Sequence, residues 1–187
     1  MISRDSSLDE IKAVVRNCLN ELYDRDAPLF QRNKKKGICE RCIVFRFAHY
    51  LQNLLRNSFF VDCDFNSSFV GLFDEHGHFV ARERGGKEIR NPDGTLTKRF
   101  VDIIVHKRNY TIPTNDLICF ELKKWDNDSL RELKKDINNL KQLTSTYGYL
   151  YGFHLIFGQT RDSSKWTIFQ HGQAIETDAK IYENETN

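Results

Sequence analysis

Apolar residues recur at helical spacing in three stretches of the chain. The first covers residues 8–24 and follows a capping box formed by Ser7 and Glu10. The second covers residues 38–57, and the third begins at Ser129, where another capping pattern precedes an apolar stripe. The stripe consists of Leu130, Leu133, Ile137, Leu140 and Leu143. We therefore predict three amphipathic helices.

Short apolar runs occur between and after the last two of these stretches. They cover residues 59–65, 100–107, 117–124, 149–157 and 166–170. Their length and their flanking turn residues predict strands. The segment 66–99 is rich in glycine and charge, so we expect a hairpin or mobile excursion there rather than core. The polar tail 174–187 is expected to fray.

The order of the elements predicts an α/β (α+β) fold, in which helices flank one mixed central sheet. The 187 residues and 22.0 kDa fit a single domain with a sizeable core. Residues 1–37 would form an N-terminal helical extension of that domain.

Bulk composition narrows the function only slightly. The net charge of +2 and the pI near 8.2 neither demand nor exclude a nucleic-acid partner. Five cysteines, no signal peptide and no apolar run of membrane length favour a cytoplasmic protein without a membrane partner. Cys39 and Cys42 form a C-x-x-C, but the second pair that a zinc site needs is missing. A zinc-dependent regulator is therefore the weakest of the alternatives.

Two neighbouring predicted strands carry the candidate chemistry. Asp102 lies on the first, and Glu121 and Lys123 lie on the second within F-E-L-K-K. Residues i and i+2 of a strand share a face, so Glu121 and Lys123 point the same way. Carboxylate oxygens suit Mg²⁺, and a lysine beside them can orient or deprotonate a water, or offset charge on a phosphate. The pattern predicts metal-dependent phosphodiester hydrolysis.

Other acidic side chains could join this site. Glu40 lies on the apolar stripe of the second predicted helix, where a carboxylate needs a partner such as a metal, Lys123 or a metal-bound water. Asp62 and Asp64 share one face of the first strand and either add to the site or form a solvated strand face. His106 shares a face with Asp102, although a histidine at a strand end is usually structural.

These residues resemble the PD-(D/E)XK nuclease superfamily, whose core is an αβββαβ arrangement like that of restriction endonucleases. The resemblance spans residues 38–157 and extends to uncharacterised bacterial members. It implies that Asp102 and Glu121 bind metal, that Lys123 is the catalytic lysine and that Glu40 is the helix glutamate. It also implies a main-chain carbonyl ligand from Leu122.

The chain departs from the family pattern in two places. Val101 replaces the proline of the family's name, which many members lack. Gln142 and Tyr147 are five positions apart, whereas the repair-exonuclease branch has them four apart, and this makes that branch a poor match.

The resemblance implies an enzyme that cuts DNA, with RNA not excluded, using Mg²⁺ or substituted Mn²⁺. An endonuclease is favoured, and a homodimer is compatible. Basic residues in the segment 81–99 either contact phosphates or form an ordinary solvated loop. The candidates for such contacts are Arg82, Arg84, Lys87, Lys98 and Arg99. The alternative function is a catalytically silent scaffold or nucleic-acid-binding protein with the same fold.

Overall fold

The computed structural model describes most of the chain. It covers residues 2–30, 39–56, 58–65, 68–73, 76, 79–85, 87–91, 93–107, 116–126 and 129–181, with residues 65, 68–73 and 79–85 as main chain only. Its helices are α1 (Leu8–Arg25), α2 (Glu40–Leu55) and α3 (Leu130–Ser145), with short 3-10 turns at Ala27–Phe30 and Arg161–Ser163.

Six strands form the central sheet in the order β1-β6-β7-β8-β9-β10. Their bounds are β1 (Phe60–Phe65), β6 (Val101–His106), β7 (Asp116–Lys124), β8 (Tyr151–Phe157), β9 (Lys165–Gln170) and β10 (Gln173–Lys180). Only β7 and β8 pair in parallel, and α3 is the crossover that this pairing requires. The predicted mixed α/β fold and its three helices are thus confirmed, and each predicted strand matches one of these six.

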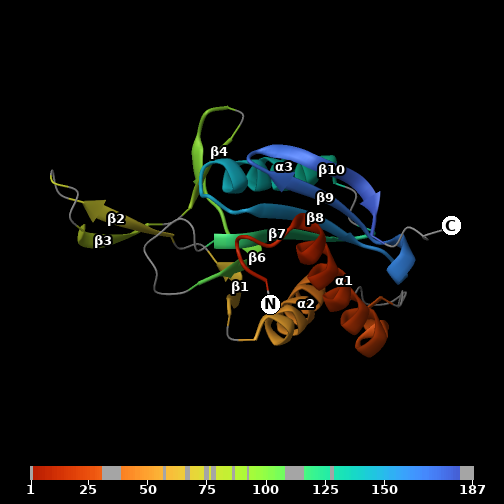
Figure 1. The fold of residues 1–187 in the computed structure, drawn as a ribbon. Helices are drawn as coiled ribbons and strands as arrows, with labels where there is room; N and C mark the ends of the chain where they lie inside the picture. Colours follow the sequence, from red (N-terminus) through yellow and green to blue (C-terminus); the bar gives the residue numbers. More distant parts are fainter. Residues whose placement is uncertain are drawn as a thin grey trace.

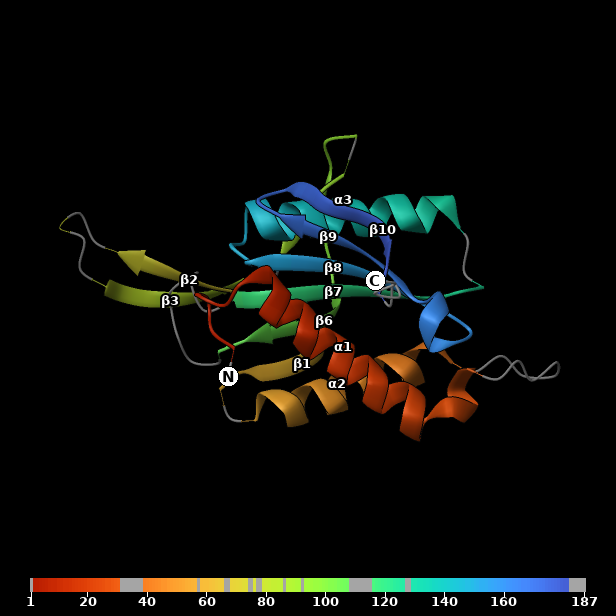
Figure 2. The same ribbon diagram turned by 45° about the vertical axis from the view of Figure 1, so that its right-hand side comes forward.

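Helices cover both faces of the sheet. α1 and α2 pack together on one face, and α3 lies on the other (Figures 1 and 2). The first helix begins as the sequence predicts: the backbone N–H of Glu10 donates to Ser7 Oγ, and the backbone N–H of Ser7 donates to the Glu10 carboxylate. Ile11, Leu19 and other apolar residues of α1 enter the main core, so α1 is a full part of the domain.

The segment before α1 also contacts the sheet. Arg4 Nη1 donates hydrogen bonds to the carbonyls of Asp116, 2.9 Å away, and Gly148, 3.1 Å away. These carbonyls lie at the start of β7 and just before β8. Arg4 therefore fastens the beginning of the parallel strand pair.

The segment 66–99, for which a hairpin or a mobile excursion was predicted, contains two hairpins. Strands β2 (Ser68–Phe73) and β3 (Phe79–Gly85) form a ribbon that projects from the body (Figures 1 and 2). Strands β4 (Glu88–Arg90) and β5 (Leu96–Lys98) form a second hairpin beside α3. Ile89 of β4 is fully buried, so the expectation that this segment avoids the core is wrong for the second hairpin.

The polar tail was also predicted wrongly in part. Residues Gln173–Lys180 form β10, which pairs with β9 at the edge of the sheet, and Ile181 is buried beyond it. Lys12 of α1 fixes the strand through an ion pair of 2.7 Å with Glu176. Residues 182–187 lie outside the described residues.

Candidate active site

Asp102 and Glu121 lie on the same face of the sheet. β6 and β7 run antiparallel with Ile103 opposite Phe120, which places Asp102 level with Glu121. Ile103 and Phe120 both enter the core under α1 and α2, so their sequence neighbours point toward α3. The two carboxyl groups that the sequence singles out are therefore brought together.

Asp102 is held by the backbone of the neighbouring strand. Its Oδ2 accepts a hydrogen bond of 2.7 Å from the backbone N–H of Leu122. Burial, with smaller effects of the Asp136 and Glu40 carboxyl groups, raises the pKa of Asp102 to about 6 against the opposing effects of the Leu122 N–H and Lys123. A cation beside this carboxyl would favour its ionised form.

Glu121 is almost completely enclosed, with 4% of its surface exposed. Asn139 of α3 donates its side-chain N–H to Glu121 Oε1 at 2.9 Å. Burial raises the pKa of Glu121 well above its usual value, and Asp102 and Asp136 add to that effect. A charged carboxylate here has one amide donor and two acidic neighbours, so its ionisation is costly without a positive partner.

Lys123 is surrounded by carboxylates. Its Nζ lies 3.2 Å from Asp136 Oδ2, and 3.9 Å from both Glu40 Oε1 and Glu132 Oε2. Partial burial opposes the charged form, but Asp136, Glu40 and Asp102 together raise the pKa of Lys123. The lysine is thus a stable ammonium ion, which suits stabilisation of negative charge better than removal of a proton from water.

Glu40 reaches the site from the opposite layer. It is the first residue of α2, and its Oε2 accepts a hydrogen bond of 3.2 Å from the backbone N–H of Lys124, the last residue of β7. The other oxygen faces Lys123. The helix that carries Glu40 therefore meets the site at the C-terminal end of β7.

Two residues of α3 were missed by the sequence reasoning. Asp136 and Asn139 are both buried against the sheet and contact Lys123 and Glu121 respectively. The signal was present: Asp136 lies three positions after Leu133 and thus on the apolar stripe of the helix. A polar residue at such a position needs a polar partner inside the protein.

His154 of β8 is a third missed residue. It is paired in register with Glu121, is buried, and its Nε2 has no hydrogen-bond partner among the described residues. Burial, with a smaller effect of Lys123, lowers the pKa of His154 to about 4. The imidazole is thus neutral at physiological pH. In Y-G-F-H-L-I-F, it occupies the alternate position to the buried aromatic residues.

The other acidic candidates lie on β1, where Asp62 has its own partner and Asp64 is level with Asp102 in the pairing of β1 with β6. Asp62 Oδ2 accepts a hydrogen bond of 2.7 Å from His106 Nε2, and this links β1 to β6. Asp64 is exposed and has a φ of 48°. The structure therefore gives His106 a partner on β1 and does not bring it to Lys123.

The basic residues that were predicted to contact phosphates differ in their exposure to solvent. Lys98 is exposed, and Arg99 is partly buried and donates from Nη2 to Asn91 Oδ1 at 3.2 Å. Lys87 is only 1% exposed, and its Nζ lies 5.5 Å from the centre of the Tyr149 ring. The prediction that Lys87 contacts phosphates is wrong, because its ammonium group is enclosed. The side chains of Arg82 and Arg84 lie outside the described residues.

The oxygen donors of Asp102 and Glu121 are the groups at this site that could bind a metal ion. Within the part of the chain that the structure describes, no group of three or more His, Cys, Asp or Glu side chains is arranged to hold a metal ion. Magnesium, however, commonly takes one or two carboxylates from a protein and completes its shell with water and substrate phosphate. Asp102 and Glu121 would supply these two carboxylates, whose pKa values are raised mainly by burial, and a cation bound between them would favour their ionised forms. The residues present fit a hard, oxygen-binding cation.

Comparison with known proteins finds no family model, no curated protein and no solved structure that matches the chain. In the described residues, no helix combines the length and the apolar composition of a membrane span. The function is therefore argued from the geometry of the site.

Proposed function

We propose that this protein is a Mg²⁺-dependent nuclease of the PD-(D/E)XK kind that hydrolyses phosphodiester bonds in DNA. The observation that carries the proposal is the meeting of Asp102, Glu121 and Lys123 on one face of two adjacent strands. Elements α2, β1, β6, β7, α3 and β8 also follow one another in the order of the αβββαβ core, with the two hairpins inserted after β1.

Each side chain has a role that follows from its surroundings. Asp102 and Glu121, with the carbonyl of Leu122, would hold Mg²⁺, which when bound makes a water more acidic and polarises a phosphate. The Asp102 carboxylate is oriented by the Leu122 N–H, and the Glu121 carboxylate by Asn139. Both carboxylates are therefore held in fixed orientations.

Lys123 would act on the reacting phosphate. Its ammonium group is kept charged by Asp136 and is therefore ready to stabilise the extra negative charge that develops during hydrolysis. Glu40 lies on the other side of Lys123 and would orient the attacking water by accepting a hydrogen bond from it. Asp136 is a positioning residue, since it acts through Lys123.

Plasmid cleavage with Mg²⁺ tests the proposal. Lys123→Ala and Asp102→Asn should each lower the rate by about 100- to 1,000-fold, because each removes a charge that acts in the transition state. Lys141→Ala removes an exposed lysine from α3 and serves as the matched control with unchanged rate. Cleavage by Lys123→Ala at the parental rate would show that the assignment is wrong.

Metal calorimetry separates the enzyme from a silent scaffold with the same fold. The wild type should bind Mg²⁺ or Mn²⁺, and Glu121→Gln should not. If the wild type neither binds Mg²⁺ or Mn²⁺ nor cleaves DNA, the scaffold function would be favoured.

A further inference from the structure

The β4–β5 hairpin is fastened to α3 along the whole of β4. The Tyr147 hydroxyl donates to the carbonyl of Glu88 at 2.8 Å and accepts from its N–H at 2.7 Å. The Gln142 amide makes the same pair of bonds to Arg90, at 2.6 and 2.8 Å. Ile89 between them is fully buried. Gln142 of α3 and Tyr147, which follows the end of α3, thus complete the hydrogen bonding of β4, and the hairpin forms a fixed wall.

A groove of about 810 Å³ lies between this wall and the first turns of α3. Four cationic side chains line it, against two acidic ones. The cations are Arg99, Arg131, Lys134 and Lys135, and the acids are Asp93 and Glu132. The hairpin side carries one cation and one acid, whereas the helix side carries three cations and one acid, so the excess positive charge lies along α3.

The cations on the helix side outnumber the acids beside them, which are Glu132 and the Asp136 carboxyl that interacts electrostatically with Lys135. Arg131, Lys134 and Lys135 are exposed and lie three and four positions apart, so they share a side of α3. None of them forms an ion pair with another described residue. Like charges at this spacing repel, and a polyanion in the groove would remove the repulsion.

The groove also opens toward the candidate active site. Glu132 lines the groove, and its Oε2 lies 3.9 Å from Lys123 Nζ. α3 is 16 residues long and begins in the groove at its cap Ser129, so the positive end of its dipole adds to the side-chain charges. A strand of phosphates lying in the groove would therefore lead to Lys123.

We propose that this groove binds the phosphodiester backbone of the nucleic acid on which the active site acts. The inference rests on the proposed nuclease function and assigns its substrate contacts to Arg99, Arg131, Lys134 and Lys135. The cations are distributed over two walls, so several linked phosphates match them better than a single anion. Contacts of this kind position the chain of the substrate without reading its sequence.

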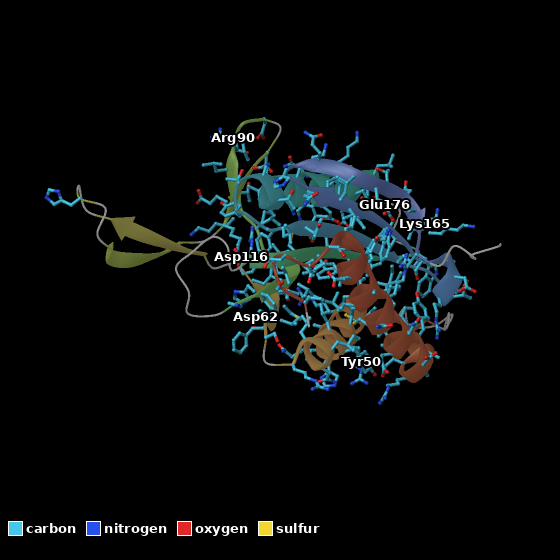
Figure 3. All side chains as sticks on the ribbon, viewed as in Figure 1. Tyr50, Asp62, Arg90, Asp116, Lys165 and Glu176 are labelled. Atoms are coloured by element: carbon cyan, nitrogen blue, oxygen red, sulfur yellow. The ribbon has the colours of Figure 1, made fainter. Side chains whose placement is uncertain are left out.

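The test measures binding without cleavage. Fluorescence anisotropy of a labelled DNA duplex is followed in EDTA for the wild type and for Lys134→Gln/Lys135→Gln. The matched control, Lys165→Gln/Lys180→Gln, removes the same charge from an exposed pair that faces across β9 and β10. Lys165 lies at the end of the molecule away from Arg90 and the hairpin (Figure 3).

The groove variant should bind about ten-fold more weakly than the wild type, and its slope of log K against log salt should be shallower by roughly 1.8, because two phosphate contacts are lost. The control should retain the wild-type affinity and slope. Equal affinities for the two double variants would overturn the proposal, because only bulk charge would then matter. Displacement of the duplex by millimolar inorganic phosphate would also overturn it, by showing a site for a single anion.

Two further measurements identify the substrate and separate the two proposals. An RNA duplex of the same sequence is titrated in parallel, and equal losses on DNA and RNA would support recognition of the shared backbone. A loss on RNA alone would assign the groove to RNA and overturn DNA as its ligand. Plasmid cleavage by wild type and Lys123→Ala is scored separately. If the wild type cleaves DNA but the groove variant binds as tightly as the wild type, the groove proposal is refuted and the nuclease proposal stands. If the wild type does not cleave DNA but the groove variant binds more weakly, the nuclease proposal is refuted and the groove still binds nucleic acid.

Discussion

The two faces of the central sheet are made by the same strands but have opposite characters. Under α1 and α2 the face is aromatic and aliphatic: the ring of Phe120 lies 5.6 Å from that of Phe47 and 5.3 Å from that of Phe153. Residues at these positions have no surface exposed to solvent. This face supplies hydrophobic stabilisation through the large buried cluster that contains Ile103 and Phe120.

The face under α3 instead buries charge. Glu121, Asp136 and His154 are enclosed there, with Asp102 and Lys123 beside them. Only a smaller apolar cluster, which includes Ile104 and Leu140, holds this face together. On each central strand, the side chains that face α1 and α2 therefore stabilise the fold, and those that face α3 form the polar site. The burial of the first set offsets the free energy that it costs to bury the polar groups of the second.

Truncating a large side chain on the apolar face should change stability more than any of the other substitutions. Phe120→Ala should lower the free energy of unfolding by about 3–5 kcal/mol, because it leaves a cavity among packed rings. Urea unfolding measures the change. Phe100→Ala, at a position that is 63% exposed, is the control and should change stability by less than about 0.5 kcal/mol. Similar losses for both variants would mean that this face is loosely packed.

Neutralising the polar face should separate activity from stability. Glu121→Gln should reduce cleavage by about 100- to 1,000-fold, as expected when a charged group of the site is lost. In EDTA at neutral pH, the same variant should be more stable than the parent by about 1–3 kcal/mol, since an amide is cheaper to bury than a carboxylate. Thermal and urea unfolding report the second effect. A less stable variant would contradict the idea that this carboxylate is costly without a cation.

The pH dependence of stability should also differ between the faces. Asp102 has a pKa raised from 3.8 to about 6 in the folded chain, so the folded state binds its proton more tightly than the unfolded state does. Its contribution is present in full below about pH 4 and is lost as the pH rises through about 6. In metal-free buffer, the wild type should lose about 2 kcal/mol across this interval relative to Asp102→Asn. Parallel stability curves for the two proteins would exclude the effect.

The smallest expected effect concerns the bond between Asn139 and Glu121. A double-mutant cycle with Asn139→Ala and Glu121→Ala should give a coupling of about 1 kcal/mol in urea unfolding, because the two groups share one buried hydrogen bond. Additive changes would show that the amide does not support the carboxylate. Asn138→Ala, whose side chain donates to the carbonyl of Arg90 instead, provides the uncoupled control.

Much of this arrangement could be predicted from local patterns in the sequence. The apolar runs of β6 and β7 are buried on both faces, so they stand out as strands, and an acid within such a run is conspicuous. The alternation of side chains then places Glu121 and Lys123 together. The first helix could be located because Ser7 and Glu10 cap it within four residues.

The remainder depends on contacts between distant parts of the chain. Asp136 stands out on the apolar stripe of its helix, but its partner and that of Asn139 come from β7 and cannot be identified from local sequence. The polar β10 has exposed residues at most positions, so it lacks the alternation that identifies a strand and is held mainly by backbone pairing to β9. Lys87 lies in a basic segment of the sequence, and its burial beside Tyr149 depends on residues far along the chain.

The contacts of Arg4 have a practical consequence for handling the protein. Its guanidinium group joins the leading peptide to two carbonyls that precede the parallel strands, and Ile2 beside it is buried. Trimming the first few residues, or attaching a bulky purification tag ahead of them, would release this clasp. A tag joined at the carboxyl end would leave the clasp intact.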